Sequence, residues 1–435
     1  MLTRRRQLTI VCLLIASLFV ACSKHESVRS SATDDVGHVP VETVRFANLP
    51  YADHTYSSIG VAKGWFKDVG IDLQVNTIKI EDAVPSLESG AYDVVSLPPG
   101  VLFSSYDTAP DLCSFVFGDM FQGFAIMAQP GRGYKTYTEY RNAGMTHSDA
   151  IRGVVGQMKG KIFAYPTENA IKPFIDLALQ KGGLSRRDVK SIVLDDPLTM
   201  IAMRNKQADF QVGGVPSRIE LQKEGFVPIL SSIDLAKGAL PSPDSKELAS
   251  ILENGWAMKK DRYRSNPALA LRLASVNYRI MKFMATNQDE AISIHMAYLS
   301  KVTGQKFTAE DGRIIYNDLD PFVTFEDQKP WFYDKTNPLY YANVNGAILN
   351  SFIADKVYKN KPPSVEDVIF DDDTYRELLR LKLATNEVLE KFKTNPSSDG
   401  RIAQEIVEAQ RFYDAYDFYD ANRLASAAWH DATAK

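Results

Sequence analysis

The stretch AKGWFKDVGIDLQV, residues 62–75, contains a change from a helical to an extended pattern. In the residues that end at Phe66, apolar side chains recur every three or four positions, which predicts a helix. After Gly70 apolar and polar residues alternate, which predicts a strand. Glycine tolerates the backbone turn at a helix end and the entry into a strand, which accounts for Gly64 and Gly70. We expect Trp65 and Phe66 to fill the space between this helix and a sheet.

Strand and helix patterns alternate on both sides of this stretch. The expected elements are a strand in TVRFANL (43–49), a helix over 56–66, a strand in IDLQV (71–75), a helix over 83–87 and a strand in YDVVSL (92–97). This βαβαβ order predicts parallel strands joined by right-handed crossovers, with helices packed over the sheet. In such sheets, ligands bind just outside the carboxyl ends of the strands. We therefore expect the loops NLPYADHTY (48–56) and SLPPG (96–100) to line a binding site.

Four further segments follow in an order that carries a resemblance. They are QMKGKIFAYP (157–166), GLSRRDVKSIVLDDPLTMIAMRNKQADFQVGG (183–214), EGFVPILSS (224–232) and the segment from NGWAMKK to DEAISI (254–294). Together with the first βαβαβ unit, they resemble the solute-binding proteins of the nitrate, alkanesulfonate, taurine and thiamine-precursor uptake family. The similarity in pattern covers about residues 42–370.

The resemblance implies an α/β fold of two lobes, the type II periplasmic-binding-protein fold, with a hinge of two crossovers. The crossovers are expected near residues 128–131 and 254–258. The expected divisions are lobe I at 42–128 plus 254–370, lobe II at 129–253 and a C-terminal helical extension at 371–435. The implied function is capture of a small molecule by hinge closure and its delivery to the permease and ATPase subunits of an ABC importer.

The first 22 residues have the layout of an export signal. Three arginines precede an apolar run from Leu8 to Ala21, which is short for a membrane-spanning helix. The run closes with FVAC, which resembles the lipobox of bacterial lipoproteins, so Cys22 is expected to carry lipid and to begin the mature chain. Residues 23–41 are polar and are expected to form a flexible tether. The expected location is the periplasmic side of the bacterial envelope, with a lipid anchor in a membrane; a secreted protein without an anchor is the alternative.

Composition and charge argue against several other classes of protein. The 435 residues carry a net charge of −4 with dispersed Lys and Arg, which argues against nucleic-acid binding. Cys113 has no expected partner and is interpreted as a core residue, so no disulfide is expected. The six histidines lack metal-ligand spacing, and the sequence has no nucleophile elbow or phosphate-binding glycine loop. We therefore expect a monomer that is not an enzyme and that has no metal or other cofactor.

Position at the expected strand ends, together with the resemblance, identifies candidate ligand-binding residues. Those of lobe I are Asn48, Pro50, Tyr51, His54, Ser96, Leu97 and Pro98, and those of lobe II are Thr167, Glu168, Asn169, Gly213, Gly214 and Val215. The adjacent pair Asp53 and His54 is interpreted as solvated or structural, or else as part of the site. Pro98 and the proline after it lack backbone N–H donors, which favours a ligand with an apolar face.

The segment PTENAIKPF (166–174) bears on the charge of the ligand. Glu168 places a carboxylate where a helix dipole would favour an incoming anion, which disfavours nitrate and sulfonates unless Lys172 offsets it. A neutral or amine-bearing heterocycle, such as a pyrimidine precursor of thiamine, fits better, with Tyr51 stacked on it and Asn169 in hydrogen bonds. Two alternatives remain: Glu168 caps its own helix and points out of the cleft, or the ligand is an anion of the nitrate or sulfonate type.

Two segments exceed what two lobes need. GRGYKTYTEYRNAGMTHSDA (131–150) is expected to be a polar surface insertion. The C-terminal extension contains QRFYDAYDFYDANR (410–423), in which aromatic residues surround a helix with interleaved aspartates. We expect it to pack on lobe I as a helical hairpin. The alternative is a docking surface for a partner, which would make the protein a sensory or docking lipoprotein outside transport.

Overall fold

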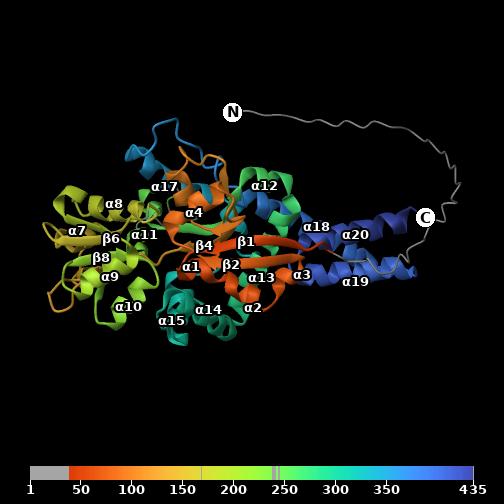
Figure 1. Ribbon diagram of the computed structural model, residues 1–435, viewed down its shortest axis with the longest axis horizontal. Helices are drawn as coiled ribbons and strands as arrows, with labels where there is room; N and C mark the ends of the chain where they lie inside the picture. The colour runs from red at the N-terminus through yellow and green to blue at the C-terminus, as the bar shows by residue number, and fades with distance from the viewer. Residues whose placement is uncertain (1–38, 168, 238–241, 243–244, 435) are drawn as a thin grey trace, which may run out of the picture. The chain divides into compact units, whose positions relative to one another are not determined.

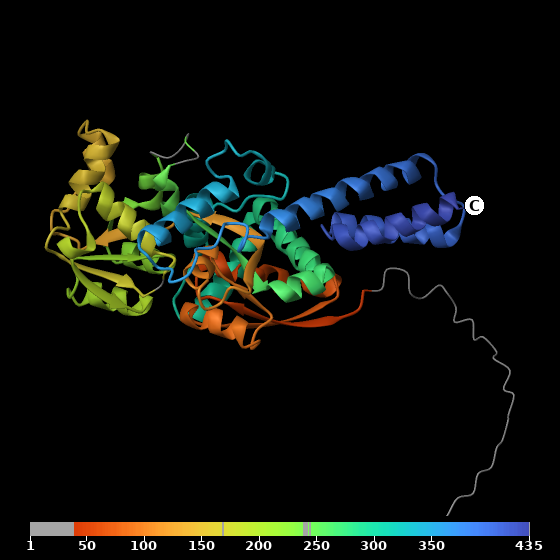
Figure 2. The same ribbon diagram turned by 90° about the horizontal axis from the view of Figure 1, so that it is seen from above.

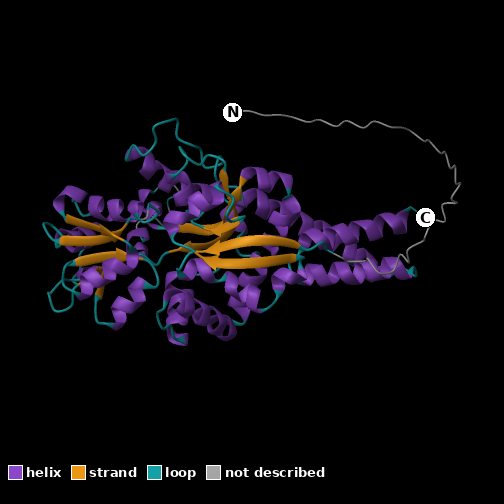
Figure 3. Ribbon diagram, viewed as in Figure 1, coloured by secondary structure: helices purple, strands orange, loops and turns teal. Residues whose placement is uncertain are grey.

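A computed structural model describes residues 39–434 except 168, 238–241, 243 and 244. The described chain contains two five-stranded sheets, each flanked by helices (Figure 1 and Figure 3). This is the expected α/β fold of two lobes. The export signal 1–22 with Cys22, most of the tether and Glu168 lie outside the described residues.

The sheet of lobe I is mixed. In spatial order its strands are β2 (Ile71–Thr77), β1 (Glu42–Asn48), β3 (Val94–Ser96), β10 (Leu252–Lys259) and β4 (Leu112–Phe121). β1 pairs in parallel with β2 and β3, which confirms the predicted βαβαβ start. β10 returns from the second sheet and runs antiparallel to both β3 and β4.

The sheet of lobe II repeats this plan. Its strands, in spatial order, are β7 (Lys190–Leu194), β6 (Ile162–Pro166), β8 (Phe210–Gly213), β5 (Ala125–Ala128) and β9 (Val227–Ser231). β6 pairs in parallel with β7 and β8, and β5 runs antiparallel to its two neighbours. The carboxyl ends of the parallel strands therefore lie at one edge of each sheet.

Helices cover both sheets. Those built into lobe I are α1 (Ala52–Thr55), α2 (Ser57–Ala62), α3 (Trp65–Asp68), α4 (Ile80–Glu88), α5 (Pro99–Ser104), α12 (Lys260–Ser265), α13 (Pro267–Thr286), α14 (Gln288–Thr303), α15 (Ala309–Ile314), the π-turn η3 (Ile315–Leu319), α16 (Lys329–Tyr333) and α17 (Tyr341–Ala354). Those of lobe II and the return crossover are α6 (Tyr137–Asn142), α7 (His147–Gly156), α8 (Lys172–Lys181), η1 (Arg186–Asp188), α9 (Asp196–Arg204), α10 (Ser217–Lys223), α11 (Ser232–Ala236) and η2 (Lys246–Ser250). The expected surface insertion 131–150 is largely helical, because it contains α6 and the start of α7.

The chain passes between the sheets twice, and the first passage lies earlier than expected. Residues 122–124 join β4 to β5, and the return enters β10 at Leu252. The sequence predicted the first crossover near 128–131, after β5, because this short apolar strand was assigned to lobe I. In the structure β5 pairs with β8 and β9 of the other sheet.

The transition from helix to strand before β2 is built much as the sequence predicts. Gly64 has a φ of 74°, and it divides the expected helix into α2 and α3. Phe66 is 2% exposed and its ring lies 6.3 Å from that of Trp256 on β10, so it fills the space between helix and sheet. Trp65 packs elsewhere: its ring contacts Phe283 of α13 at 5.4 Å.

The C-terminal extension consists of three helices, α18 (Asp371–Thr394), α19 (Gly400–Asp414) and α20 (Phe418–Thr433). Figure 2 shows α18 running out from lobe I and the α19–α20 hairpin lying beside it. Arg272 of α13 holds the carboxylate of Asp420 in α20 through two hydrogen bonds of 2.7 and 3.1 Å. Val39, before β1, is buried in an apolar cluster with residues of all three helices. Among the residues described, no helix has the length and apolar character needed to cross a bilayer.

Candidate ligand-binding cleft

The loops at the carboxyl ends of the two sheets face each other and touch. The backbone N–H of Ala52 donates to the carbonyl of Val215 across the lobes at 3.4 Å. The Thr167 hydroxyl donates to Glu81 at 2.9 Å. The cleft between the lobes is therefore closed by direct contacts in this structure.

Two adjoining cavities lie in this cleft. The outer chamber has a volume of about 420 Å³, and the inner pocket is a small space of about 20 Å³. The outer chamber is lined by Pro50, Tyr51, Lys79, Glu81, Asp195, Asp196, Pro197, Leu198, Met200, Pro216, Ser217, Val302, Thr303 and Gln305. The inner pocket is lined by Tyr51, Asp53, His54, Phe121, Phe124, Pro166, Asp196, Gly214, Val215 and Leu252. Tyr51 of lobe I and Asp196 of lobe II border both spaces, so a ligand in the cleft would touch both lobes.

Asp196 carries a buried acceptor atom without a partner, beside the outer chamber. It is the first residue of α9 and is 8% exposed. Ser217 donates its hydroxyl to Oδ2 of Asp196, whereas Oδ1 has no hydrogen-bond partner among the described residues. Burial raises the pKa of Asp196 to about 6, so the group is mostly ionised at neutral pH. A buried, unpaired carboxylate oxygen is costly, and a ligand N–H would remove that cost.

The charged side chains around the cleft are mainly acidic. Glu81 and Asp195 join Asp196 around the outer chamber, and Asp53 lines the inner pocket. Among the described lining residues, the one cation is Lys79, whose amine lies 3.2 Å from Asp195 and is already paired. The other lining side chains of the outer chamber are largely apolar. The chamber therefore suits a ligand with an N–H donor or a positive charge and an apolar body.

Five predicted residues line the two cavities, and a sixth supports them. The five are Pro50, Tyr51, His54, Gly214 and Val215. Gly213 lies beside Asp196: a Cβ added to it would be 2.7 Å from the unpaired Oδ1. This close approach explains why glycine occupies position 213.

Four other predicted residues are buried away from both cavities. Asn48 accepts a hydrogen bond from Ser57, and Ser96 lies beneath His54. Leu97 belongs to the hydrophobic core, and Pro98 caps the start of α5. Each lies at a strand end as expected, but its side chain faces the interior of lobe I.

Thr167 and Asn169 of lobe II form hydrogen bonds to residues of lobe I. Thr167 bonds to Glu81 as described above, and the Asn169 amide lies 3.4 Å from the hydroxyl of Ser104 in α5. Neither residue lines the two cavities. These contacts make the segment after β6 part of the closed cleft rim.

Asp53, His54 and Ser96 have the residue types of a hydrolytic triad. His54 Nδ1 lies 2.9 Å from the Ser96 hydroxyl, and Nε2 lies 3.6 Å from Asp53. Ser96 is 0% exposed and lines neither cavity, so its oxygen has no access to a substrate. Burial lowers the pKa of His54 to about 3, so the imidazole is neutral at physiological pH. The arrangement is a buried structural network, and no group of His, Cys, Asp and Glu in the described chain could hold a metal ion.

Asp195 and Asp196 were not among the residues predicted from the sequence. Both follow β7 in the motif LDDP, at the carboxyl end of a parallel strand. That position was a usable signal, because ligands gather at such ends. Glu81 was missed because it is the second residue of α4 in lobe I and lies outside the two loops expected to line the site.

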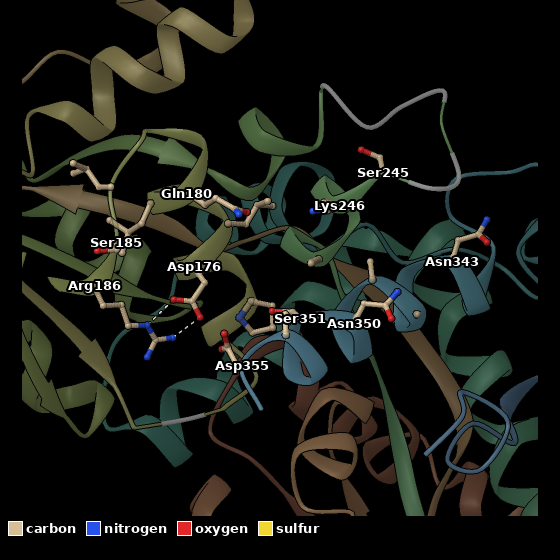
Figure 4. A pocket seen from close by; sticks show the side chains of 18 of the residues that line it. Asp176, Gln180, Ser185, Arg186, Ser245, Lys246, Asn343, Asn350, Ser351 and Asp355 are labelled. Atoms are coloured by element: carbon tan, nitrogen blue, oxygen red, sulfur yellow. Dashed lines mark hydrogen bonds and ion pairs between the residues drawn. The ribbon is translucent and has the colours of Figure 1, made fainter. Parts of the chain in front are cut away.

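A second, larger groove lies away from the strand ends. Its volume is about 840 Å³, and its walls come from α8 of lobe II, α17 of lobe I and η2. Figure 4 shows Arg186 bonded to Asp176 through two hydrogen bonds, with Asp355 of lobe I nearby. Because the walls belong to both lobes, the shape of this groove depends on closure.

Comparison with solved structures finds the same fold in transport proteins. The chain is similar to a putative sulfonate ABC transporter, periplasmic sulfonate-binding protein SsuA, from Methylobacillus flagellatus KT, with a TM-score of 0.53, 15% identity and coverage of 79% of this chain and 96% of the other. It is similar to the periplasmic nitrate-binding protein NrtA from Synechocystis PCC 6803, with a TM-score of 0.54, 19% identity and coverage of 78% and 89%. A ligand-binding component of an ABC-type import system from Staphylococcus aureus, with zinc bound, has a TM-score of 0.55, 11% identity and coverage of 77% and 98%.

The likeness to these proteins lies in the fold. No protein-family model matches the chain, and no curated protein matches it in sequence. These structures cover 79% and 78% of this chain, so about a fifth of the chain lies outside the common fold.

Proposed function

We propose that this protein is an extracytoplasmic solute-binding protein that captures a small molecule between its lobes and delivers it to an ABC importer. The observation that carries the proposal is the pair of adjoining cavities between the lobes, bordered jointly by Tyr51 and Asp196. The fold shared with periplasmic binding proteins supports it. The permease and ATPase subunits of the importer are the proposed partners, and a lipid on Cys22 is the proposed membrane anchor.

The ligand we propose is a neutral or amine-bearing heterocycle, such as a pyrimidine precursor of thiamine. The acidic lining and the unpaired oxygen of Asp196 favour a ligand that donates N–H groups. Tyr51 is half-buried and lines both cavities, which supports a ligand with an aromatic ring that Tyr51 would contact. The outer chamber, at about 420 Å³, has room for a single heterocycle.

An anion of the sulfonate or nitrate type is the second candidate. Two of the proteins with this fold are a putative sulfonate-binding protein and a nitrate-binding protein. In this chain, the amine of Lys79 and the N-terminus of α9 are the groups of the outer chamber that would favour an anion. Asp195 and Asp196 occupy that same helix start and oppose it electrostatically.

The test is ligand screening on the purified full chain. Native mass spectrometry would detect a retained molecule, and thermal-shift measurements would compare pyrimidines, amines, sulfonates and nitrate. An amine-bearing ligand should stabilise the chain, and D196N should weaken its binding about 10- to 100-fold, the effect of losing a hydrogen bond to a charged group. D188N, which changes a partly exposed carboxylate of lobe II outside the cleft, is the matched control and should bind normally.

The other outcomes separate the parts of the proposal. Stabilisation by sulfonate or nitrate would refute the preference for an amine and keep the solute-binding function. No response to any solute and no retained molecule would contradict the solute-binding function itself and favour a docking lipoprotein.

A further inference from the structure

The two strands of lobe I that continue into lobe II carry buried polar side chains next to the hinge. Asp119 lies two residues before the end of β4, and Glu253 and Asn254 lie at the start of β10. All three side chains are 0% exposed. Asp119 and Asn254 are paired across the two strands.

Asp119 faces a second carboxyl group, that of Asp320. Asp320 follows η3 and is also 0% exposed, and each of the two carboxyl groups acts on the pKa of the other. Carboxylates only accept hydrogen bonds. One oxygen of Asp119 and both oxygens of Asp320 have no donor among the described residues. A proton shared between the two groups supplies the missing donor.

Glu253 and Asp371 repeat this arrangement on the neighbouring strand. Asp371 is the first residue of α18, and both of its oxygens lie 3.0 Å from the hydroxyl of Ser114 on β4. The amide of Asn345 donates to one oxygen of Glu253, and the other oxygen has no partner in the described chain. Glu253 and Asp371 each act on the pKa of the other. We call Asp119–Asp320 and Glu253–Asp371 the hinge carboxyl pairs.

The hinge carboxyl pairs have no compensating cation. Within the described ranges, no Lys or Arg forms an ion pair with any of the four groups. The other titratable groups that act on the first pair are Asp53, Tyr56, Tyr316 and Glu253, and those around the second are Asp119, Asp372, Tyr263, Tyr278 and Cys113. In the described chain, basic groups contact these neighbours and not the pairs themselves: Arg376 pairs with Asp372, and Lys260 and Arg264 act on Cys113. The imidazoles of His54 and His295 contact Asp53 and Tyr316, and burial lowers the pKa of both histidines to about 3, so they are neutral. Burial raises the pKa of Asp119 and of Asp371 to about 7, and it raises the pKa of their partners above the usual range.

Hydrogen bonds join the first pair to the ligand cleft and to the first crossover. The Asn254 amide donates both to Asp119, at 3.2 Å, and to Asp53, which lines the inner pocket. The backbone N–H of Gln122, in the first crossover, donates to the carbonyl of Leu319 at 3.0 Å. Leu319 precedes Asp320, so a change in the Asp119–Asp320 separation acts directly on the crossover.

We propose that the hinge carboxyl pairs make lobe closure depend on protons: one shared proton in each pair holds the hinge strands in the closed arrangement, and loss of these protons opens the cleft. As a regulation of the ligand site, this inference rests on the proposed function. The physical cause is repulsion between two buried carboxylates that no cation screens. Closure should therefore be favoured at acidic pH and weakened as pH rises above neutral.

The pH dependence of unfolding counts the protons that the hinge carboxyl pairs retain in the native state, and it needs no ligand. Unfolded carboxyls titrate near pH 4, so between about pH 5 and pH 7 the native chain holds protons that the unfolded chain has lost. The unfolding constant should rise about tenfold per pH unit for each retained proton. D320N or D371N replaces one carboxyl with an amide that donates the hydrogen bond itself, so each should lower this slope by about one proton. D93N, which alters a carboxylate paired with Arg45, should leave the slope unchanged.

Small-angle scattering on the ligand-free full chain then tests the hinge. The radius of gyration should increase between pH 6 and pH 9 in the wild type and in D93N, and it should stay constant in the D320N/D371N double variant. A pH-independent radius in the wild type, or the same increase in the double variant, would overturn the proposal. If D320N or D371N prevents folding, the other single variant is measured alone. Its increase in the radius of gyration between pH 6 and pH 9 should be about half of the wild-type increase, and an increase as large as that of the wild type would overturn the proposal. These measurements use no ligand, so their failure is distinct from a failure of the proposed function.

Discussion

The ion pair between Arg272 and Asp420 fixes the C-terminal extension to lobe I, and its removal should be costly. The guanidinium makes two hydrogen bonds to the carboxylate, at 2.7 and 3.1 Å. The two side chains are 14% and 0% exposed, and Asp417, also 0% exposed, lies beside them. R272M would leave buried acidic groups with only Arg423, whose side chain is 45% exposed, as a cationic neighbour.

The expected loss of stability in R272M follows from the burial of the Arg272–Asp420 ion pair. Removing one partner of a buried ion pair destabilises a protein by about 3–5 kcal/mol, because the remaining charge is uncompensated. The matched control is Arg380, which also makes two hydrogen bonds to a carboxylate, that of Glu377, but with side chains 62% and 40% exposed. R380M should cost less than about 1 kcal/mol, because water already solvates both charges.

Urea unfolding followed by circular dichroism would compare the free energies of unfolding of R272M, R380M and the wild type. D420N added to R272M should recover part of the loss, because it removes the unpaired charge. Equal losses for R272M and R380M, or a loss below about 1.5 kcal/mol for R272M, would refute the argument that this contact is a buried anchor of the extension.

Two further predictions concern glycines. G64A should lower the free energy of unfolding by about 1–2 kcal/mol: its φ of +74° strains an alanine, while its Cβ would meet no atom within 4 Å. G70A, at φ +73°, should lower it by at least about 1 kcal/mol more, because its Cβ would also lie 2.5 Å from Val39 and 2.8 Å from the Pro40 carbonyl. Chemical denaturation of both variants would measure this, and equal losses would contradict the steric reasoning. G213A should weaken ligand binding, because its Cβ would lie 2.7 Å from the unpaired oxygen of Asp196. The control is G156A in α7 of lobe II, outside the cleft, whose Cβ would meet nothing within 4 Å and which should bind as the wild type does. Titration calorimetry would show the difference, and unchanged affinity in G213A would argue that Asp196 does not contact the ligand.

Local patterns predicted the first sheet well because the signals lie within single elements. The alternation in IDLQV predicts the strand that the structure shows as β2. The helix before Gly64 also forms, as α2, but the apolar spacing did not mark its buried side: α2 buries Ser57, Ser58, Ile59 and Gly60 and exposes Val61 and Ala62. The first crossover was misplaced because β5, AIMA, has four buried residues and no alternation to show which sheet it joins. That choice depends on pairing with strands about 85 to 100 residues later in the chain.

The candidate site was harder to predict because side-chain direction decides it. Asn48 and Tyr51 come from the same loop, yet Asn48 turns inward to Ser57 and Tyr51 borders both cavities. Asp196 could have been found from its place after β7. The hinge carboxyl pairs could not, because Asp119 and Asp320 are about 200 residues apart and neither lies in a recognisable motif.

The structure also changes how the docking alternative must be tested. Truncation before residue 374 would remove Tyr375, which is 1% exposed and stacked on Phe332 of lobe I at 4.5 Å. Truncation at 371 would in addition remove Asp371, the partner of Glu253 at the hinge. Loss of a partner after either truncation would therefore not distinguish a lost docking surface from a damaged lobe. Substitution of exposed residues such as Leu383, 64% exposed, and Val407, 60% exposed, leaves these buried contacts intact. Because α18 begins at Asp371, a member of the hinge carboxyl pairs, and ends in the extension, truncating it would disturb both the hinge and any docking surface. Substitutions of exposed residues would test docking without changing the hinge.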